Sequence, residues 1–358
     1  YYIITNLIVF FCAVSFDIFY RLSYNSIKGP ANFKSKYLIS AETPEPSKYS
    51  KIILLLSFLC VAITLYIYKS QPILLVFRGV DGLELEDNTI ASSQFLGPLF
   101  NCIIRPIPII CLINYMCIGK KKHIKILLFF LALIACFPTS LARLRVAAYY
   151  LPILIILFPN LRYHNRFVNF FIFGFLLVFP LLNNFRYFGK DGFRWFDIDF
   201  TMFCNMNYDS YQSFAFVLQN NIITYGKQLA VVLFFWVPRS IWPDKPYFSG
   251  MTVAQDYGLW FHQISMNYFA EGYINFGIIG TFAFTIFLAY ISAKFDMYYW
   301  KLNDAKIHSL YTPFFLLFIG MYFFFMRGDL MYGFEYTICL LLANLGVYKI
   351  TKSIYNIR

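Results

Sequence analysis

Charged residues are scarce in this sequence. They make up 13% of its 358 residues, whereas 59% of the residues are hydrophobic and the mean hydropathy is +0.59. A soluble domain carries about a quarter charged residues, so this composition excludes an ordinary soluble protein. Inside a bilayer the backbone must satisfy its own hydrogen bonds, and long apolar runs do so as helices. The sequence therefore predicts an all-α polytopic integral membrane protein.

Metal ligands and familiar catalytic motifs are equally scarce. The chain has four histidines, and its eight cysteines form no CxxC pair and no Cys/His cluster. Seven cysteines lie in apolar segments and Cys204 in a polar one, which favours small buried side chains over zinc ligands or disulfides. There is no nucleotide-phosphate loop, GxSxG elbow or HExxH motif. We expect neither a metal nor a cofactor.

Apolar runs predict the membrane helices, within a single transmembrane domain over residues 1–358. The runs lie near 1–20, 52–77, 95–118, 126–142, 144–159, 167–182, 271–292, 310–326 and 336–349. Because the sequence starts with Tyr1 rather than Met, we expect that it is truncated and that further helices precede it.

The loops between these runs sort by charge. The basic set comprises 21–51, 119–125, 159–166, 293–309 and the tail 350–358. Loops rich in Lys and Arg stay on the cytoplasmic side of a membrane. The segments that then face outward are 78–94, 139–145, 183–270 and 327–335.

The longest outward segment, 183–270, contains one apolar stretch at 227–238. This stretch is only about half as long as a membrane span needs to be. If it crossed the bilayer, the basic loop 293–309 would lie outside. We therefore predict a large external loop that contains a short interfacial or re-entrant helix, ended by Pro238.

The cations on the outer side are mostly arginines, whereas those on the inner side are mostly lysines. The outer set comprises Arg78, Arg143, Arg145, Arg186, Arg194, Arg239 and Arg327, with Lys190, Lys227 and Lys245. A planar guanidinium can bind phosphate through two parallel hydrogen bonds. As a set, these residues favour a pyrophosphate or polyanion at the membrane surface. Contacts with lipid phosphates and ion pairs such as Arg327 with Asp329 are the alternative for each one singly.

Arg105 differs because it lies inside a predicted span, between apolar residues and Pro106. An ionisable side chain at membrane depth is a candidate site residue by default.

Few outward groups can act as a base. His262 is the only histidine predicted to lie outside, and Glu271 stands where the long loop re-enters the membrane. Partial burial there would raise the pKa of Glu271 toward the range of a working base. Stabilisation of a helix N-terminus by the same carboxylate is an equally good interpretation.

Two neighbouring segments carry a family resemblance. VPRSIWPDKP at 237–246, followed by YFAEGYINFG at 268–277, resembles the Wzy-type O-antigen polymerases, which join oligosaccharide repeat units in bacterial inner membranes. Residue by residue, the resemblance nominates Arg239, Lys245, Glu271, Asn275 and Gly277. Arg143, Arg145 and Arg186 match the family by position and type rather than by motif.

The resemblance implies a GT-C-like helical bundle with its active site facing the periplasm. The implied reaction moves a growing glycan from undecaprenyl pyrophosphate onto a lipid-linked repeat unit, with inversion and without a metal. The pyrophosphate would be bound by Arg143, Arg145, Arg186, Arg239, Lys245 and Arg327, and the catalytic candidates are Glu271 and His262. The expected partners are these lipid-linked donors and acceptors, membrane lipid and a chain-length regulator protein. No nucleic acid is expected.

Two alternatives remain open. An O-antigen ligase uses the same donor with a lipid A–core acceptor, and His262 fits the histidine on which such ligases rely. A flippase for lipid-linked oligosaccharides would have charged residues along a central path and repeated halves. Here the charge lies in outer loops, and no internal repeat is found.

Overall fold

The computed structural model describes residues 1–26, 38–40, 47–77, 96–163, 165–178, 180, 209–259, 261–262, 264–304, 307–309 and 311–352. Most of these residues are helical, which confirms the predicted all-α class. They also include a two-stranded antiparallel pair, β1 (Leu38–Ser40) and β2 (Ile307–Ser309), with Ile39 opposite His308.

The chain forms two compact units. The first unit comprises Tyr1–Asn32, Thr201–Lys301 and Tyr322–Thr337, and the second comprises Phe33–Phe200, Leu302–Met321 and Ile338–Arg358.

Consecutive apolar helices build the second unit. They are α2 (Ser47–Ile67), α3 (Leu96–Leu99), α4 (Ile107–Ile118), α5 (Lys122–Ala135), α6 (Arg143–Leu157) and α7 (Arg166–Phe173). Helices α2, α4 and α5 pack against one another. Tyr49 of α2 stacks on Tyr115 of α4, with ring centroids 5.7 Å apart.

Single turns of 3₁₀- and π-helix connect these elements. They are η2 (Pro72–Leu75), η3 (Phe100–Ile104), η4 (Pro138–Ser140), η5 (Pro159–Arg162) and η6 (Gly174–Val178). Proline lies in the first turn of η2, η4 and α4, where its missing N–H leaves no helical bond unmade. The helix predicted at 126–142 begins earlier and ends earlier in the structure, because α5 spans Lys122–Ala135 and a separate turn starts at Pro138.

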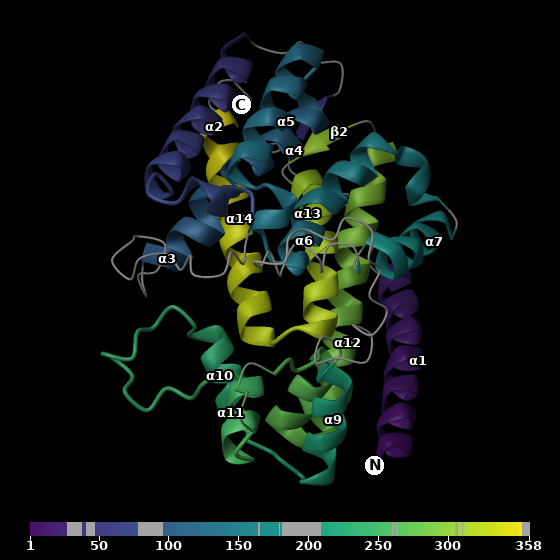
Figure 1. The fold of residues 1–358 in the computed structure, drawn as a ribbon. Coiled ribbons are helices and arrows are strands. Elements are labelled where there is room, and N and C mark those ends of the chain that lie inside the picture. Colours follow the sequence, from purple (N-terminus) through teal and green to yellow (C-terminus); the bar gives the residue numbers. More distant parts are fainter. Residues whose placement is uncertain are drawn as a thin grey trace. The chain divides into compact units, whose positions relative to one another are not determined.

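The first unit combines one long helix with short ones. It contains α1 (Tyr2–Ser26), α9 (Asp209–Gln219), α10 (Lys227–Leu233), α11 (Ser249–Asp256) and most of α12 (Tyr268–Asp304). It also takes the end of α13 (Tyr311–Arg327) and the start of α14 (Leu330–Lys352). Helices α9, α10 and α11 gather around the start of α12 (Figure 1). Their core includes Phe214, Val217, Val253, Ala270 and Ile274.

Helix α12 is two helices joined at a sharp break. Phe276 and Gly277 leave helical geometry, and the φ of Gly277 is +64°, a conformation that favours glycine. Residues 268–275 fold back on residues 278–304. The two segments approach so closely that a Cβ atom on Gly272 would lie 2.7 Å from the carbonyl oxygen of Gly280. The Tyr268 hydroxyl also donates to the Phe284 carbonyl at 3.2 Å. The prediction of one continuous helix over 271–292 is wrong at this break.

Within the described residues, six helices are long and apolar enough to cross a membrane, which fits a multi-pass membrane protein. They are Tyr2–Ser26, Lys48–Ile67, Phe100–Ile118, Lys122–Ser140, Tyr268–Lys301 and Leu330–Thr351. Of these stretches, Lys122–Ser140 combines α5 with η4, and Tyr268–Lys301 contains the break at Gly277. Three predicted runs form shorter apolar helices, at Arg145–Leu157, Arg166–Val178 and Thr312–Arg327. The short helix predicted at 227–238 is present as α10, but it ends at Leu233 and not at Pro238. Its interfacial position stays a prediction.

Candidate functional site

The segment 226–250 of the first unit, here called the cationic arm, carries two of the nominated cations. It begins at Gly226, whose φ of +84° leads the chain into α10. A Cβ atom on Gly226 would lie 3.2 Å from the ring of Phe276, so the arm starts tightly against the break in α12. It then passes Arg239 and Lys245 and ends in the first turn of α11.

Asn275 holds the start of the arm. It is fully buried, and its side-chain oxygen accepts a hydrogen bond from the Leu229 N–H at 2.7 Å. The carbonyl of Asn275 accepts from the Gly226 N–H at 3.0 Å, and that of Ile274 accepts from the Thr224 N–H at 2.6 Å. A helix that ends leaves its last carbonyls without hydrogen-bond donors. Here Thr224, just before the arm, and Gly226, at its start, supply these donors.

Glu271 holds the end of the arm. It lies one helical turn before Asn275 and is fully buried. One carboxylate oxygen accepts from the Ser249 hydroxyl at 2.7 Å, and the other from the Leu330 N–H at 3.1 Å. The carboxyl group thus joins the first turns of α11 and α14.

Asp329, directly before α14, binds the first turns of the same two helices. Its carboxylate accepts from the Gly250 N–H at 3.2 Å and from the Met331 N–H at 2.9 Å. Burial raises the pKa of Asp329 to about 6, although these N–H groups favour the charged form. Four hydrogen bonds therefore tie Ser249, Gly250, Leu330 and Met331 to two buried carboxyl groups.

Lys245 shapes the arm from within. Its ammonium donates to the carbonyls of Phe234, Phe235 and Val237 at 3.3, 2.7 and 2.9 Å, just beyond the end of α10. Burial, followed by the charge of Arg239, lowers the pKa of Lys245. An ammonium has three hydrogens, so these carbonyls use its full donor capacity. This geometry suits a residue that fixes the loop.

Arg239 is held differently and is exposed. Its guanidinium donates to the carbonyl of Lys245 and, at 3.4 Å, to that of Pro246. It also lies over the Tyr247 ring, 4.3 Å from the centroid. These contacts occupy one face and two of the five N–H groups. The remaining donors sit on a side chain whose position is already fixed, which is what an anion-binding arginine requires.

The other predicted site residues are distributed over both units. In the first unit, His262 is exposed between α11 and α12, and Arg327 ends α13 and interacts electrostatically with Asp209. In the second unit, Arg143 begins α6 and Arg145 follows in the same helix. Arg186 lies outside the described residues.

Sequence reasoning missed the partners of Glu271. Asp329 was considered as an ion-pair partner of Arg327 and as a weaker candidate for the base, but not as a partner of the helix ends, although its place directly before α14 is a common helix-capping signal. Ser249 gave no signal, because a bond across twenty-two residues depends on how the chain folds back.

No family model, curated protein or solved structure matches this chain.

Proposed function

We propose that this protein is an O-antigen polymerase of a bacterial inner membrane. It transfers a growing glycan from undecaprenyl pyrophosphate onto a lipid-linked repeat unit at the periplasmic face, within a GT-C-like fold. One observation carries the proposal. The two segments that resemble the family depend on each other in space, because Asn275 and Glu271 anchor the two ends of the arm that bears Arg239.

The chemistry of the arm supports a pyrophosphate-dependent transfer. When the glycosidic bond to the lipid carrier breaks, negative charge grows on the leaving pyrophosphate. A positioned guanidinium stabilises that charge without a metal, and the preset geometry of Arg239 lowers the ordering needed when the donor binds. Arg143, Arg145, Arg186 and Arg327 remain proposed members of the same anion-binding set, and Lys245 fixes the loop around it.

Glu271 has two proposed roles that one substitution separates. As a base it would take the proton of the acceptor hydroxyl, and as an anchor it would only hold α11 and α14. Its full burial and its bonds to Ser249 and Leu330 support the anchor. In Glu271→Gln the amide oxygen can still accept from Leu330 and the Ser249 hydroxyl can turn to accept, so we expect polymerisation to persist within about tenfold. If a folded Glu271→Gln variant lost a thousandfold or more in polymerisation rate, the role of Glu271 as the base would be supported instead.

The proposal is tested by polymerisation in vitro with purified protein, a defined lipid-linked repeat unit and EDTA. We expect Arg239→Ala to shorten the chains and lower the rate by about 100-fold or more, the usual effect of losing one charge-stabilising donor. Arg143→Ala should also collapse chain length, and neither change should lower the amount of protein in the membrane.

Arg21→Ala is the matched control, since Arg21 is an exposed arginine of the same unit that pairs with Asp17 on α1. If both Arg239→Ala and Arg143→Ala still made normal long chains, the proposal that these arginines bind the pyrophosphate would be contradicted.

The ligase alternative rests on one observation, the exposed His262. Offering lipid A–core as acceptor in the same assay separates the two. Transfer to that acceptor, lost in His262→Ala, would identify a ligase, whereas elongation of the repeat unit identifies a polymerase.

A further inference from the structure

The cationic arm leaves the first unit at one end of a segment that is long enough to cross a membrane. From the break to Lys301, which is exposed in the last turn of α12, residues 278–301 cover about 36 Å at a rise of about 1.5 Å per residue. The hydrocarbon layer of a bilayer is about 30 Å thick. When Lys301 lies in water on one side, the break in α12 therefore lies close to the opposite boundary of this layer.

Two sets of contacts hold the arm at this boundary. Its start packs against Phe276, at the break itself. The ring of Phe235 contacts that of Phe334 edge to face, with centroids 6.2 Å apart, and the ring centroids of Phe248 and Tyr332 lie 5.1 Å apart. Phe334 and Tyr332 lie in the first two turns of α14, which is also long and apolar enough to cross a membrane. The arm therefore lies beside the ends of two such helices.

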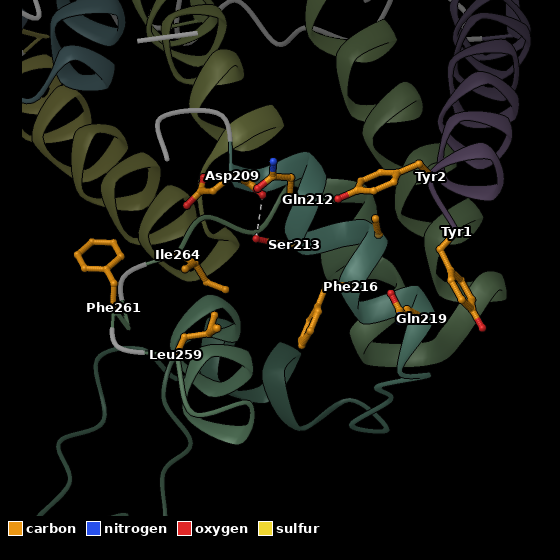
Figure 2. A pocket seen from close by; sticks show the side chains of 11 residues that line it. Tyr1, Tyr2, Asp209, Gln212, Ser213, Phe216, Gln219, Leu259, Phe261 and Ile264 are labelled. Atoms are coloured by element: carbon orange, nitrogen blue, oxygen red, sulfur yellow. Dashed lines mark hydrogen bonds between the residues drawn. The ribbon is translucent and has the colours of Figure 1, made fainter. Parts of the chain in front are cut away.

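Several side chains of the arm are apolar and exposed. Trp236 and Ile241 are 65% and 74% exposed, and Leu233 and Phe234 are half-exposed. Figure 1 shows the arm extending from α10 to the side, away from α12. The unit has a cavity beside α9, and none of these four residues lines it (Figure 2). Large apolar side chains gathered on one exposed segment mark a surface that is covered by something other than water.

The backbone of the arm beyond α10 finds many of its partners within the arm itself. Residues 234–246, here called the arm loop, form no α-helix, and three of them are prolines, which have no N–H. Lys245 and Arg239 donate to five carbonyls of this loop. The carbonyl of Pro238 accepts from the N–H groups of Ile241 and Trp242 at 3.0 and 3.1 Å. Backbone groups without partners are costly next to lipid, so these bonds lower the cost of placing the loop at a lipid surface.

We infer that the arm loop is a membrane anchor, which lies at the surface of the lipid leaflet beside the break in α12 and inserts Trp236 and Ile241 between the acyl chains. Tryptophan is favoured where headgroups meet acyl chains, and isoleucine is favoured deeper. The bilayer contact that the sequence predicted for a helix at 227–238 thus belongs to the loop after it, because α10 ends at Leu233. The anchor also holds Arg239 at the depth of lipid-borne phosphate, and only this last step rests on the proposed function.

The direct test measures the depth of the arm loop in protein reconstituted in lipid nanodiscs. A nitroxide spin label is attached to Ile241→Cys. Electron paramagnetic resonance then measures its collisions with oxygen, which concentrates among acyl chains, and with a water-soluble nickel chelate. Asp256→Cys, at an exposed position in the last turn of α11, is the matched control, and the unaltered protein gives the background from its own cysteines. We expect the ratio of oxygen to nickel collisions to be several-fold higher at position 241 than at position 256.

A second pair of variants tests whether the apolar side chains cause the insertion. With the label on Trp236→Cys, Ile241→Asp puts a charge among the acyl chains and should move the loop toward water, so collisions with the nickel chelate should rise several-fold. Ile241→Val keeps an apolar side chain and should leave them unchanged. Both positions are exposed, so these changes should not affect folding.

Three results would overturn the anchor. Equal collision ratios at positions 241 and 256 would place the loop in water. A label shielded from both reagents would mean that protein covers the loop. A label that leaves water only after a lipid-linked repeat unit is added would mean that the hydrocarbon chain of the substrate, and not the bilayer, covers it.

Depth and polymerisation are separate measurements, so the anchor and the proposed function can fail separately. An inserted loop in a protein that never polymerises would uphold the anchor and refute the polymerase. Long chains made by a protein whose loop lies in water would do the reverse. Where both hold, Ile241→Asp should slow polymerisation more than Ile241→Val does, because it moves Arg239 away from the lipid surface.

Discussion

Two arginines in this protein have similar partners and opposite surroundings. Arg105, in the second unit, is only 4% exposed and donates to the Ala135 carbonyl, the Tyr68 hydroxyl and the Ser140 hydroxyl at 2.8, 3.2 and 2.9 Å. Its guanidinium lies 5.3 Å from the centroid of the Tyr68 ring. Arg239, in the first unit, also uses neutral oxygens and a tyrosine ring, but it is exposed.

The difference in burial separates an arginine that stabilises the fold from one that is accessible to a ligand. Around Arg105, neutral acceptors from three parts of the chain compensate a charge withdrawn from water, and the side chain caps the end of α5. Around Arg239, similar contacts only orient a side chain that solvent and ligands can reach. Arg105, a candidate site residue by sequence, is thus engaged in holding its unit together.

The largest effect that sharpens this comparison is on stability. Arg105→Ala should lower the free energy of unfolding by about 3 kcal/mol or more, because it leaves buried oxygens without donors. Arg105→Lys, which keeps the charge but not the fork, should lose about half as much. Arg239→Ala should change stability by less than about 1 kcal/mol. Thermal unfolding of the purified protein, followed by tryptophan fluorescence, measures all three. Equal midpoints for Arg105→Ala and Arg239→Ala would break the distinction.

A smaller effect concerns the carboxyl anchors of the arm and their response to pH. Burial raises the pKa of Asp329 from 3.8 to about 6, so the folded state holds a proton that the unfolded chain has released. The resulting stability is complete below about pH 4 and is lost as the pH rises through 6. We expect a loss on the order of 2 kcal/mol between these limits.

Asp329→Asn should weaken this dependence without removing it, because the carboxyl group of Glu271 is buried beside Asp329, whereas Asp256→Asn should keep it unchanged. Unfolding midpoints measured from pH 4 to pH 8 give the comparison. A slope that persists unchanged in Asp329→Asn would mean that other groups bind the proton.

The smallest effect belongs to Lys245. Lys245→Ala removes the hydrogen-bond donor of three carbonyls. Water can partly replace this donor, so the free energy of unfolding should fall by only about 1 kcal/mol. The looser loop should slow polymerisation several-fold, well short of the loss in Arg239→Ala. Rates of the two variants, measured side by side, test the order. A larger loss in Lys245→Ala would make Lys245 the ligand-binding cation of the arm.

Much of the fold could be predicted from the sequence, and less of the site. Each of the nine predicted apolar runs corresponds to an apolar helix, six of them long enough to cross a membrane. The errors fall where tertiary contacts end or bend a helix, at Ala135 and at Gly277. The helices α9 and α11 were not predicted, because short helices with mixed composition take their stability from packing.

The candidate site shows the same division. Of the five residues that the resemblance nominated, Arg239, Lys245, Glu271 and Asn275 are connected through one arm. The fifth, Gly277, forms the break in α12. Their separate tasks were not predictable. Whether a cation serves a loop or a ligand depends on which carbonyls lie within reach, and the sequence does not contain those distances.

The sequence by itself determined that this is a helical membrane protein, because hydrophobic length and the need to satisfy backbone hydrogen bonds are local properties of a segment. Tertiary structure alone decided that Glu271 meets Ser249 and Leu330, that Asn275 meets Leu229, and that the arm begins against Phe276. These contacts join residues twenty-two to fifty-nine positions apart. Only the folded chain fixes them.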